Sequence, residues 1–404
     1  MEGILAVLKE EPLLSVVLPT GGGKSLLFML PAAIEKEGVT VVIVPFISLV
    51  NDLIDRCKAY DLEVVEWTSE QSSWATITIV VVERTTAMSV ANDDSTYLQT
   101  FLQSTSVLAA NGQLKEIVFD SCHTIITQQH FRPAMSKLFE LQRLKVPLLF
   151  LTATLPPALV TPLERMMVLK HVCYIRASSF RGNIGIRINW CDNGKALSVT
   201  ARLVKAFAQT MEPGQRTIVY CKTVKQAQTL SNKTMLNCSC YHSNLTVEER
   251  SSAIERWMQS GEQYLVATTA FGTGVDVQGV VATFHANIPY GLVDFIQESG
   301  RGGRTGERSL STIIVEEREL QMLREEVQLA GGFLKEDKAA LYRFLSTTRC
   351  RTLEVTRFLD GGDGRTCDEE GCEVCDLCLS SKQRETNVSS RLSVSFNQYF
   401  YANK

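Results

Sequence analysis

The sequence predicts an α/β protein in which two tandem parallel-sheet domains are followed by a small helical domain. Short β-rich runs alternate with helical stretches from about residue 13 to 175, and the alternation returns in a second block that ends near 316. From 317 onward the chain is charged and helical, and five cysteines then crowd into 350–378. Strands that alternate with helices in this way form parallel sheets covered on both faces.

The first predicted domain covers residues 1–175. Its β-rich runs are LLSVVLPT, VTVVIVP, ATITIVVVE, LKEIVFD and VPLLFLTAT, each bounded by turn residues. The stretches SLLFMLPAAIEKEG and ISLVNDLIDRCKAYD lie between the early runs and have helical patterns. This order of strands and helices predicts one parallel sheet.

The second predicted domain covers residues 176–316 and begins with a joint, RASSFRGN, at 176–183. Its β-rich runs are GIRINWC, QRTIVYC, CSCYH, EQYLVATT, VATFHAN and LSTIIVE. Residues 317–380 form the predicted helical domain. Residues 381–404 are a polar tail, which we expect to be disordered.

The composition is that of a soluble globular protein, with 45% hydrophobic and 21% charged residues. The longest nearly apolar run, VTVVIVPFISLV, is too short to span a bilayer and contains a proline. The first residues, MEGILAVLKEEP, lack the basic-then-apolar order of a secretory signal. We therefore expect an intracellular protein. Its net charge of −3 neither demands nor excludes nucleic acid, because phosphate binding needs only a local basic groove.

A glycine-rich stretch, LPTGGGKSLLF at 18–28, follows a strand and opens a helix. Successive glycines let backbone N–H groups close around phosphate, and a helix N-terminus adds a favourable field. Lys24 would reach the β- and γ-phosphates and Ser25 would bind Mg²⁺, although Leu18 departs from the first position of the usual pattern. A flexible loop with a chance lysine is the alternative, which the strand before and the helix after disfavour. The predicted phosphate-binding residues of the loop are Thr20, Gly21, Gly22, Gly23, Lys24 and Ser25.

Polar residues end two further strands of the first domain. Asp120 ends the run LKEIVFD and would hold Mg²⁺ directly or through water. A turn or helix-capping aspartate is equally consistent with the position alone, and the upstream phosphate loop favours the metal role. His123 alone is more often a packing residue. Thr152 and Thr154 end the run VPLLFLTAT and could report nucleotide state, but this signal is weak.

Two glycine-containing stretches of the second domain carry charged residues. VATTAFGTGVDVQG at 266–279 places Asp276 after a strand, and QESGRGGRTGE at 297–307 offers Arg301 and Arg304 on a turn. Arginines from a facing domain can neutralise charge that develops on a transferring γ-phosphoryl group. A solvated basic turn is the alternative, and it is favoured for either arginine in isolation.

The cysteines predict a metal site. Of twelve, seven are scattered, and the other five are Cys350, Cys367, Cys372, Cys375 and Cys378. Four thiolates around Zn²⁺ make a closed structural site, so one of the five is left over, with Cys367 or Cys372 the most ambiguous. The alternatives are structural disulfides, which an intracellular location disfavours, and a free-thiol cluster in a damaged domain.

Taken in order, these stretches resemble the motifs of RecQ-like DNA helicases of superfamily two, over about residues 13 to 378. LPTGGGKSLLFMLPA resembles motif I, VIVPFISLVNDLIDRC motif Ia, and VVVERTTAM the segment after the third strand. FDSCHTI with the later HFRPAM resembles motif II and its downstream loop, and LTATLPP resembles motif III. TIVYCKTVKQA, VATTAFGTGVDV and QESGRGGRTGE resemble motifs IV, V and VI, and RCRTLEVTRFLDG with its cysteines resembles the family's helical zinc domain. Each match is a moderate signal, and their common order is a strong one.

The resemblance implies two RecA-like domains that bind ATP in the cleft between them and move along single-stranded DNA, or DNA with a 3′ overhang, in the 3′-to-5′ sense. It implies a nuclear protein of DNA repair and recombination with ATP, Mg²⁺ and Zn²⁺ as cofactors. Matching by motif makes Lys24, Ser25 and Asp120 the phosphate and metal residues and Arg304 the arginine finger, with Asp276 and Arg301 also at the ATP. The implied coupling residues are His123, Thr152, Thr154 and Gln297. The implied contacts to the DNA backbone, which position without reading sequence, lie at or near Pro45, Ser48, Arg84, Thr223 and Thr269.

The chain departs from the family pattern most sharply in motif II. The family reads Asp-Glu-x-His, whereas this chain reads Asp120, Ser121, Cys122, His123. The family's glutamate orients and deprotonates the attacking water, and a serine hydroxyl is no base at neutral pH. Loss of a general base typically costs about 10²–10⁴-fold in rate. ATP binding is expected to survive, and compensation by Cys122 or His123 stays open.

Three further departures concern segments around the motifs. We expect the family's adenine-reading glutamine to be missing because the chain begins late, which suggests truncation, and we expect no winged-helix domain after the cysteines. The motif II loop also lacks the tryptophan common in bacterial members; His130, Phe131 and Arg132 occupy that region. Three hypotheses follow: a helicase with impaired hydrolysis, an ATP-gated DNA clamp that does not hydrolyse, and a decayed family copy.

Overall fold

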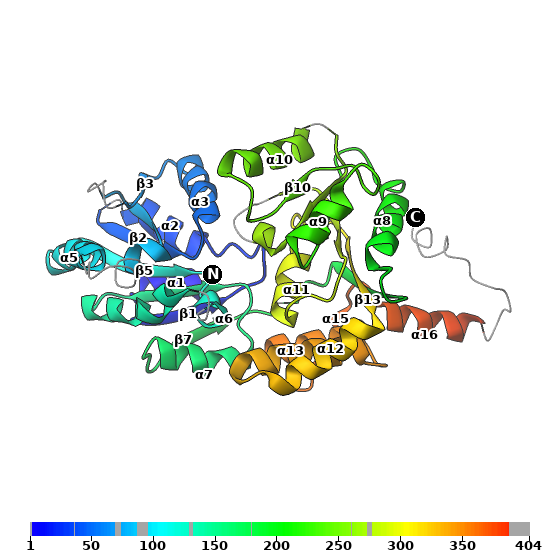
Figure 1. Ribbon diagram of the computed structural model, residues 1–404. Coiled ribbons are helices and arrows are strands. Elements are labelled where there is room, and N and C mark those ends of the chain that lie inside the picture. The colour runs from blue at the N-terminus through cyan, green and yellow to red at the C-terminus, as the bar shows by residue number, and fades with distance from the viewer. Residues whose placement is uncertain are drawn as a thin grey trace. The chain divides into compact units, whose positions relative to one another are not determined.

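The computed structural model describes residues 2–35, 37–68, 74–86, 96–128, 132–178, 180–259, 261–272 and 277–387. These residues divide into two units, one up to Phe180 and the other from Arg181 onward. Each unit is built on one parallel sheet, as Figure 1 shows. The predicted α/β class with two tandem parallel sheets is therefore confirmed. The exact domain bounds, 1–175, 176–316 and 317–380, stay a prediction.

The first unit contains a seven-stranded sheet in the order β3-β4-β2-β5-β6-β1-β7, with every pairing parallel. Its strands are β1 Leu13–Val17, β2 Val39–Val44, β3 Val64–Glu66, β4 Ile77–Val81, β5 Leu114–Asp120, β6 Leu148–Thr152 and β7 Cys173–Arg176. All residues of β2, β4 and β6 are buried, as expected for strands covered on both faces. The edge strands β3 and β7 are absent from the predicted runs, because they are short and only partly buried.

The helices of the first unit connect these strands. They are α1 Glu2–Leu8, α2 Leu26–Glu35, α3 Ile47–Ala59, α4 Val82–Thr86, α5 Thr96–Ala110, α6 Thr124–Thr127, the 3₁₀ segment η2 Pro133–Leu144 and α7 Pro157–Met166. Leu27 and Phe28 of α2 pack with Leu53 of α3 in one buried apolar cluster with the sheet. This packing fixes α2, which begins directly after the glycine-rich loop.

The second unit contains a six-stranded sheet in the order β10-β11-β9-β12-β13-β8, again with every pairing parallel. Its strands are β8 Ile184–Cys191, β9 Arg216–Tyr220, β10 Cys240–Tyr241, β11 Tyr264–Ala267, β12 Val280–His285 and β13 Ser309–Glu316. Its first helical segments are α8 Ala196–Ala208, α9 Val224–Ser231, α10 Val247–Gln259, η3 Thr269–Gly272 and α11 Leu292–Ser299. The six strands lie within or beside the six predicted β-rich runs.

Helices follow the last strand and belong to the second unit. They are α12 Glu317–Leu329, α13 Gly332–Ser346, α14 Arg351–Asp360, α15 Cys367–Glu370 and α16 Asp376–Asn387. Helices α12 and α13 pack together, and α13 also contacts α11 (Figure 1). Helix α16 includes residues 381–387 of the predicted tail, and 388–404 lie outside the described residues. No helix in the described part of the chain is long and apolar enough to cross a bilayer.

Candidate nucleotide site and cysteine centre

The glycine-rich loop between β1 and α2 is a tight turn that only small residues fit. Gly21 and Gly23 have φ values of 81° and 75°, in the left-handed region where side chains are strained. A Cβ on Gly22 would lie 2.9 Å from the carbonyl oxygen of Pro19. Lys24 reaches back across the loop, and its Nζ donates to the carbonyls of Leu18 at 3.1 Å and Pro19 at 3.0 Å. A cation and a helix N-terminus at one turn can hold an anion such as phosphate.

Asp120 ends β5 and lies at the same edge of the sheet as the glycine-rich loop. The strands β5, β6 and β1 are neighbours, and their register pairs Asp120 with Leu151 and Val17 with Thr152. Burial raises the pKa of Asp120, and the nearby charge of Lys24 acts in the opposite direction. A carboxylate and the hydroxyl of Ser25 are oxygen ligands of the kind that Mg²⁺ prefers, so these residues fit that ion.

Ser121 contributes its backbone to the corner after β5. Its φ is 56°, its N–H donates to Asp120 Oδ1 at 2.8 Å, and its carbonyl accepts from the Thr124 hydroxyl at 2.8 Å. The main chain thus fixes the Asp120 carboxylate. No side-chain contact of Ser121 is needed for this arrangement.

Neither Cys122 nor His123 is suited to act as a general base at neutral pH. Burial raises the pKa of the Cys122 thiol, which is 1% exposed, so that it stays neutral. His123 Nδ1 lies 2.8 Å from the Thr152 hydroxyl, and burial together with the charge of Lys24 lowers its pKa to about 4. The Thr152 hydroxyl in turn accepts from the Thr154 amide at 3.1 Å. His123, Thr152 and Thr154 therefore form one connected chain of hydrogen bonds.

The turn at 297–307 is built into the second unit. Arg301 is only 6% exposed, and its guanidinium stacks over Phe271 at 5.3 Å from the ring centre. Asn183 Nδ2 donates to the carbonyl of Gly303 at 2.8 Å, and a Cβ at Gly303 would lie 2.3 Å from that nitrogen. For Arg301, the alternative of a solvated basic turn is therefore wrong. Arg304 is partly buried on the same turn, Gln297 lies on α11, and Asp276 lies outside the described residues.

The proposed DNA contacts follow the carboxyl ends of neighbouring strands in each unit. In the first unit, Pro45 follows β2 and is buried, and Arg84 in α4 pairs with Glu66 and donates to the Trp67 carbonyl at 3.3 Å. Ser48 lies in α3, and its side chain is outside the described residues. In the second unit, Thr269 is exposed at the start of η3 after β11.

Thr223 in the second unit follows β9 and caps helix α9. It forms a capping box with Gln226, whose amide donates to the Thr223 hydroxyl at 3.2 Å. The cap alone accounts for a threonine at this position.

Four cysteine thiols converge in the helical part of the second unit. The Sγ atoms of Cys350, Cys367, Cys375 and Cys378 lie within 4.8 Å of one another. The Cys350 and Cys367 sulfurs are 3.4 Å apart, and those of Cys350 and Cys375 are 4.0 Å apart. Tetrahedral Zn²⁺ with Zn–S bonds of about 2.3 Å requires sulfurs about 3.8 Å apart. Cys372 is not one of the converging four; its Sγ donates to the carbonyl of Glu373 at 3.4 Å.

Backbone N–H groups and a hydroxyl surround these sulfurs. The amides of Arg351, Cys367 and Cys375 point at thiol sulfurs at 3.4, 3.3 and 3.3 Å, and the Thr352 hydroxyl lies 3.1 Å from Cys367 Sγ. Such contacts stabilise thiolates that bind a metal. The four thiols therefore fit a structural zinc centre.

Two family models match parts of this chain, one in each unit. Residues 2–161 match the family model of the DEAD/DEAH box helicase, and 198–306 match the helicase conserved C-terminal domain. The chain is 26% identical to the ATP-dependent helicase SGS1 of Saccharomyces cerevisiae over 94% of its length, and 28% identical to the ATP-dependent DNA helicase Q5 of Rattus norvegicus over 92%. The chain belongs to the RecQ-like helicases. It spans 27% and 41% of the length of those two relatives.

Solved structures show the helicase fold of this RecQ-like chain. Dbp5 of S. cerevisiae, bound to RNA and ADP BeF3, has a TM-score of 0.61 at 15% identity, over 85% of this chain and 93% of that one. The DEAD-box helicase Mss116, bound to ssRNA and UDP-BeF, has a TM-score of 0.63 at 16% identity, over 81% and 71%. The predicted RecA-like architecture is thereby confirmed.

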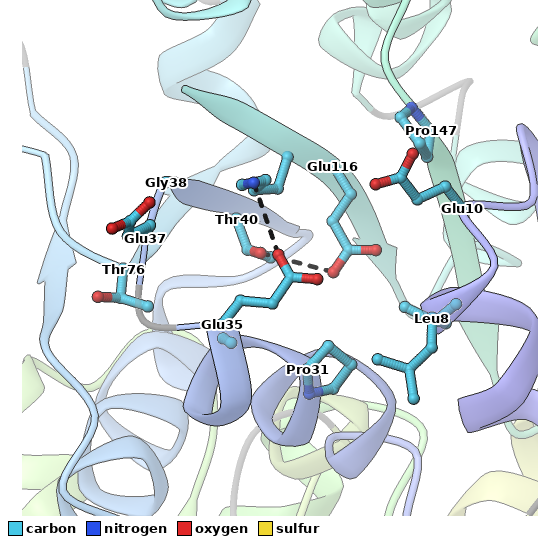
Figure 2. A pocket seen from close by; sticks show the side chains of 13 residues that line it. Leu8, Glu10, Pro31, Glu35, Glu37, Gly38, Thr40, Thr76, Glu116 and Pro147 are labelled. Atoms are coloured by element: carbon cyan, nitrogen blue, oxygen red, sulfur yellow. Dashed lines mark hydrogen bonds and ion pairs between the residues drawn. The ribbon is translucent and has the colours of Figure 1, made fainter. Parts of the chain in front are cut away.

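The structure also shows a buried acid that the sequence patterns did not predict. It lies near the amino ends of the strands of the first sheet, away from the glycine-rich loop. Glu116 on β5 is 7% exposed and faces a cavity of about 50 Å³ beside Thr40, Glu35 and Pro147 (Figure 2). Burial raises its pKa to about 7, the Thr40 hydroxyl lowers it and the charge of Glu35 raises it. The signal in the sequence is a glutamate within the β-rich run LKEIVFD, directly before three hydrophobic residues.

Proposed function

We propose that this RecQ-like chain binds ATP–Mg and single-stranded DNA as a 3′-to-5′ DNA helicase core, and that hydrolysis is impaired at Ser121. The observation that supports this most is the corner after β5. There Asp120 ends β5, which is separated by the single strand β6 from β1, the strand that leads to Lys24. The position after Asp120 carries a serine whose backbone N–H bonds to the Asp120 carboxylate. The groups for phosphate and metal are present, and the group for water activation is not.

We assign the roles as follows. Lys24 and the loop amides from Thr20 to Gly23 bind phosphate, and Ser25 and Asp120 hold Mg²⁺, which offsets the charge of the phosphates. Arg301 and Arg304 of the second unit neutralise charge on the γ-phosphoryl group, and Asp276 belongs to the same site. His123, Thr152, Thr154 and Gln297 connect nucleotide and DNA. DNA backbone contacts are assigned to Pro45, Ser48, Arg84, Thr223 and Thr269. The four converging thiols hold Zn²⁺ as a structural ion.

An ATP-gated clamp is the second candidate function, and the chemistry of residues 121–123 favours it. Ser121 and the neutral Cys122 thiol are not bases at neutral pH, and a histidine with a pKa of about 4 is a weak one. A chain that binds ATP without hydrolysing it would close on a single strand and stay closed. It should bind single-stranded DNA about tenfold more tightly with ATP than without, and release no phosphate.

DNA-stimulated phosphate release by three forms of the chain tests the proposal: the unmodified chain, Ser121→Glu, and Lys24→Ala as background. We expect the unmodified chain near background and Ser121→Glu about 10²–10⁴-fold above it. Turnover by the unmodified chain well above Lys24→Ala would mean that another group activates water, and hydrolysis is then not impaired. Silence of Ser121→Glu together with unchanged DNA affinity with ATP would reject both candidates.

A further inference from the structure

Helix α11, which precedes the arginines of the 297–307 turn, is capped by an acid from a distant helix. Asp337 of α13 is 5% exposed, and its Oδ1 accepts from the Val293 amide at 3.0 Å. The Leu292 amide also bonds to this carboxylate. Both amides belong to the first turn of α11, where N–H groups have no partner within the helix. Gly291, which occupies the N-cap position, has no side chain to serve them.

Gly291 leaves the space that the Asp337 carboxylate fills. A Cβ built on Gly291 would lie 1.8 Å from Asp337 Oδ2. The φ of Gly291 is −156°, an extended conformation that any residue adopts. The absence of a side chain there is therefore required by Asp337 and not by the backbone.

A second acid holds the segment before α11 from the neighbouring helix α12. Glu319 Oε1 accepts from Asn287 Nδ2 at 3.0 Å, and Oε2 accepts from the Ile288 amide at 3.3 Å. Residues 287–293 are thus held at two points by the α12–α13 pair. Since α12 and α13 follow the sheet in sequence, these contacts join the helical part of the unit to the segment that leads into the turn.

Packing along α11 carries this attachment toward the turn. Phe295 contacts Phe344 of α13 with ring centres 5.2 Å apart, and Glu298 Oε2 lies 3.0 Å from His285 Nε2. An α-helix of this length is rigid and about 12 Å long, so a shift at its first turn moves its last. Gln297 lies in that last turn, and Arg301 follows directly.

We propose that Asp337 is a positioning residue that sets helix α11 and, through it, the arginines of the 297–307 turn for the nucleotide. The inference rests on the proposed role of Arg301 and Arg304 at the γ-phosphate. The helices after β13 then position residues of the nucleotide site in addition to holding the four converging cysteines.

The charge of Asp337 suits the helix terminus. Burial raises its pKa to about 6, while the two amides and Lys338 act in the opposite direction. The carboxylate is therefore ionised at neutral pH, where it meets the positive end of the helix dipole.

The ratio of ATP to ADP affinity tests the inference, because groups at the γ-phosphate change that ratio and general stability does not. We would titrate fluorescent methylanthraniloyl-ATP and -ADP into the full chain and its Asp337→Ala, Asp337→Asn, Gly291→Ala and Arg304→Ala variants. Glu326→Gln is the matched control, since Glu326 also lies on this helix pair and pairs with Lys338. Asp337→Ala should lower the ratio at least fivefold. Asp337→Asn keeps an acceptor oxygen and should stay within about twofold of the parent, as should Glu326→Gln.

A double-variant cycle makes the test independent of overall folding. Gly291→Ala should lower the ratio as Asp337→Ala does, and should add nothing in the Asp337→Ala background, where the clash is gone. Additive effects of the two changes would overturn the inference. An unchanged ratio in Asp337→Ala beside a lowered ratio in Arg304→Ala would also overturn it and leave the proposed function intact. If Arg304→Ala leaves the ratio unchanged, the assignment of the arginines fails and the inference fails with it.

Discussion

The corner after β5 and the turn at 297–307 correspond to two family motifs that this chain treats differently. At the corner, Asp120 and His123 remain, but Ser121 replaces the family's glutamate. At the turn, Arg301 and Arg304 are both present. Gly302 and Gly303 are closely packed, since a Cβ on Gly302 would lie 2.1 Å from Ser309 Oγ. The corner lacks the glutamate carboxylate of the family's motif, although hydrogen bonds hold its backbone. The turn has both arginines of the motif and a closely packed backbone.

The contrast separates binding from bond cleavage. With the proposed roles, the groups that would bind phosphate or neutralise its charge are present in both units, and the departure from the family's motif falls on the position that would activate water. A chain of this kind should still distinguish ATP from ADP while it turns over slowly. Four substitutions in these units have expected effects that decrease from protein stability, through turnover and the pH dependence of unfolding, to nucleotide affinity.

The cysteine centre gives the largest effect, because structural Zn²⁺ contributes on the order of 10 kcal/mol in small zinc domains. Cys375→Ser removes a fully buried thiol of the converging four. We expect about one Zn per chain in the parent, little in the variant, and a large fall in its melting temperature. Cys372→Ser is the control and should keep its zinc. If metal-free protein melts at the same temperature as the parent, the four thiols do not bind a structural Zn²⁺.

The turn gives the next largest effect. In the Ser121→Glu background, Arg304→Ala should lower DNA-stimulated phosphate release about 10³-fold, because an arginine finger contributes 10³–10⁵ in related chemistry, by order of magnitude. Arg308→Ala is the matched control: its side chain is 72% exposed and pairs with Glu373 at 2.8 Å. If both variants lose the same amount of phosphate release, the turn acts through its overall positive charge and Arg304 is not an arginine finger.

Local patterns in the sequence predict much of both regions. The glycine loop, the strand that ends at Asp120 and the cysteine spacing are all short-range signals. The position of Cys372 outside the converging four cannot be predicted from such a signal, because the spacing C-x2-C-x2-C suggests that all three cysteines are ligands. Gly371, however, ends α15 in a left-handed conformation, and the Cys372 sulfur bonds to a carbonyl instead.

Long-range contacts escape such patterns. Asp337 lies 44 residues from the amide that it caps, and the clash that keeps position 291 a glycine exists only in the folded unit. The burial of Arg301 depends likewise on Phe271 and on strands that pair across the sheet. The short edge strands β3 and β7 carry too few buried residues to give a hydrophobic run.

Strand β5 carries two acids in different surroundings, Glu116 near its start and Asp120 at its end. The folded pKa of Glu116, about 7, lies above the ordinary 4.5, so the folded state binds the proton more tightly. The free energy of unfolding should therefore fall as pH rises from 4.5 to about 7, by up to about 3 kcal/mol. Glu116→Gln should remove that fall and raise stability at pH 8, measured by denaturant unfolding across pH. Glu35→Gln should reduce the fall without removing it, because the charge of Glu35 contributes to the raised pKa of Glu116. The same slope in Glu116→Gln as in the parent would place the titration elsewhere.

The smallest expected effect is that of Ser121→Glu on ATP affinity, because the proposal places Ser121 in bond cleavage and not in ATP binding. Ser121→Glu should change ATP affinity by less than about threefold, or about 0.6 kcal/mol. The bonds that fix the corner come from the Ser121 amide and carbonyl, which glutamate also has. Both residues carry a Cβ, so the left-handed φ of 56° strains them alike. Titration of methylanthraniloyl-ATP measures the affinity, with Lys24→Ala as the variant that should lose it. A large gain in affinity with Ser121→Glu would mean that the serine also weakens binding, and the two regions would then differ in more than the chemical step.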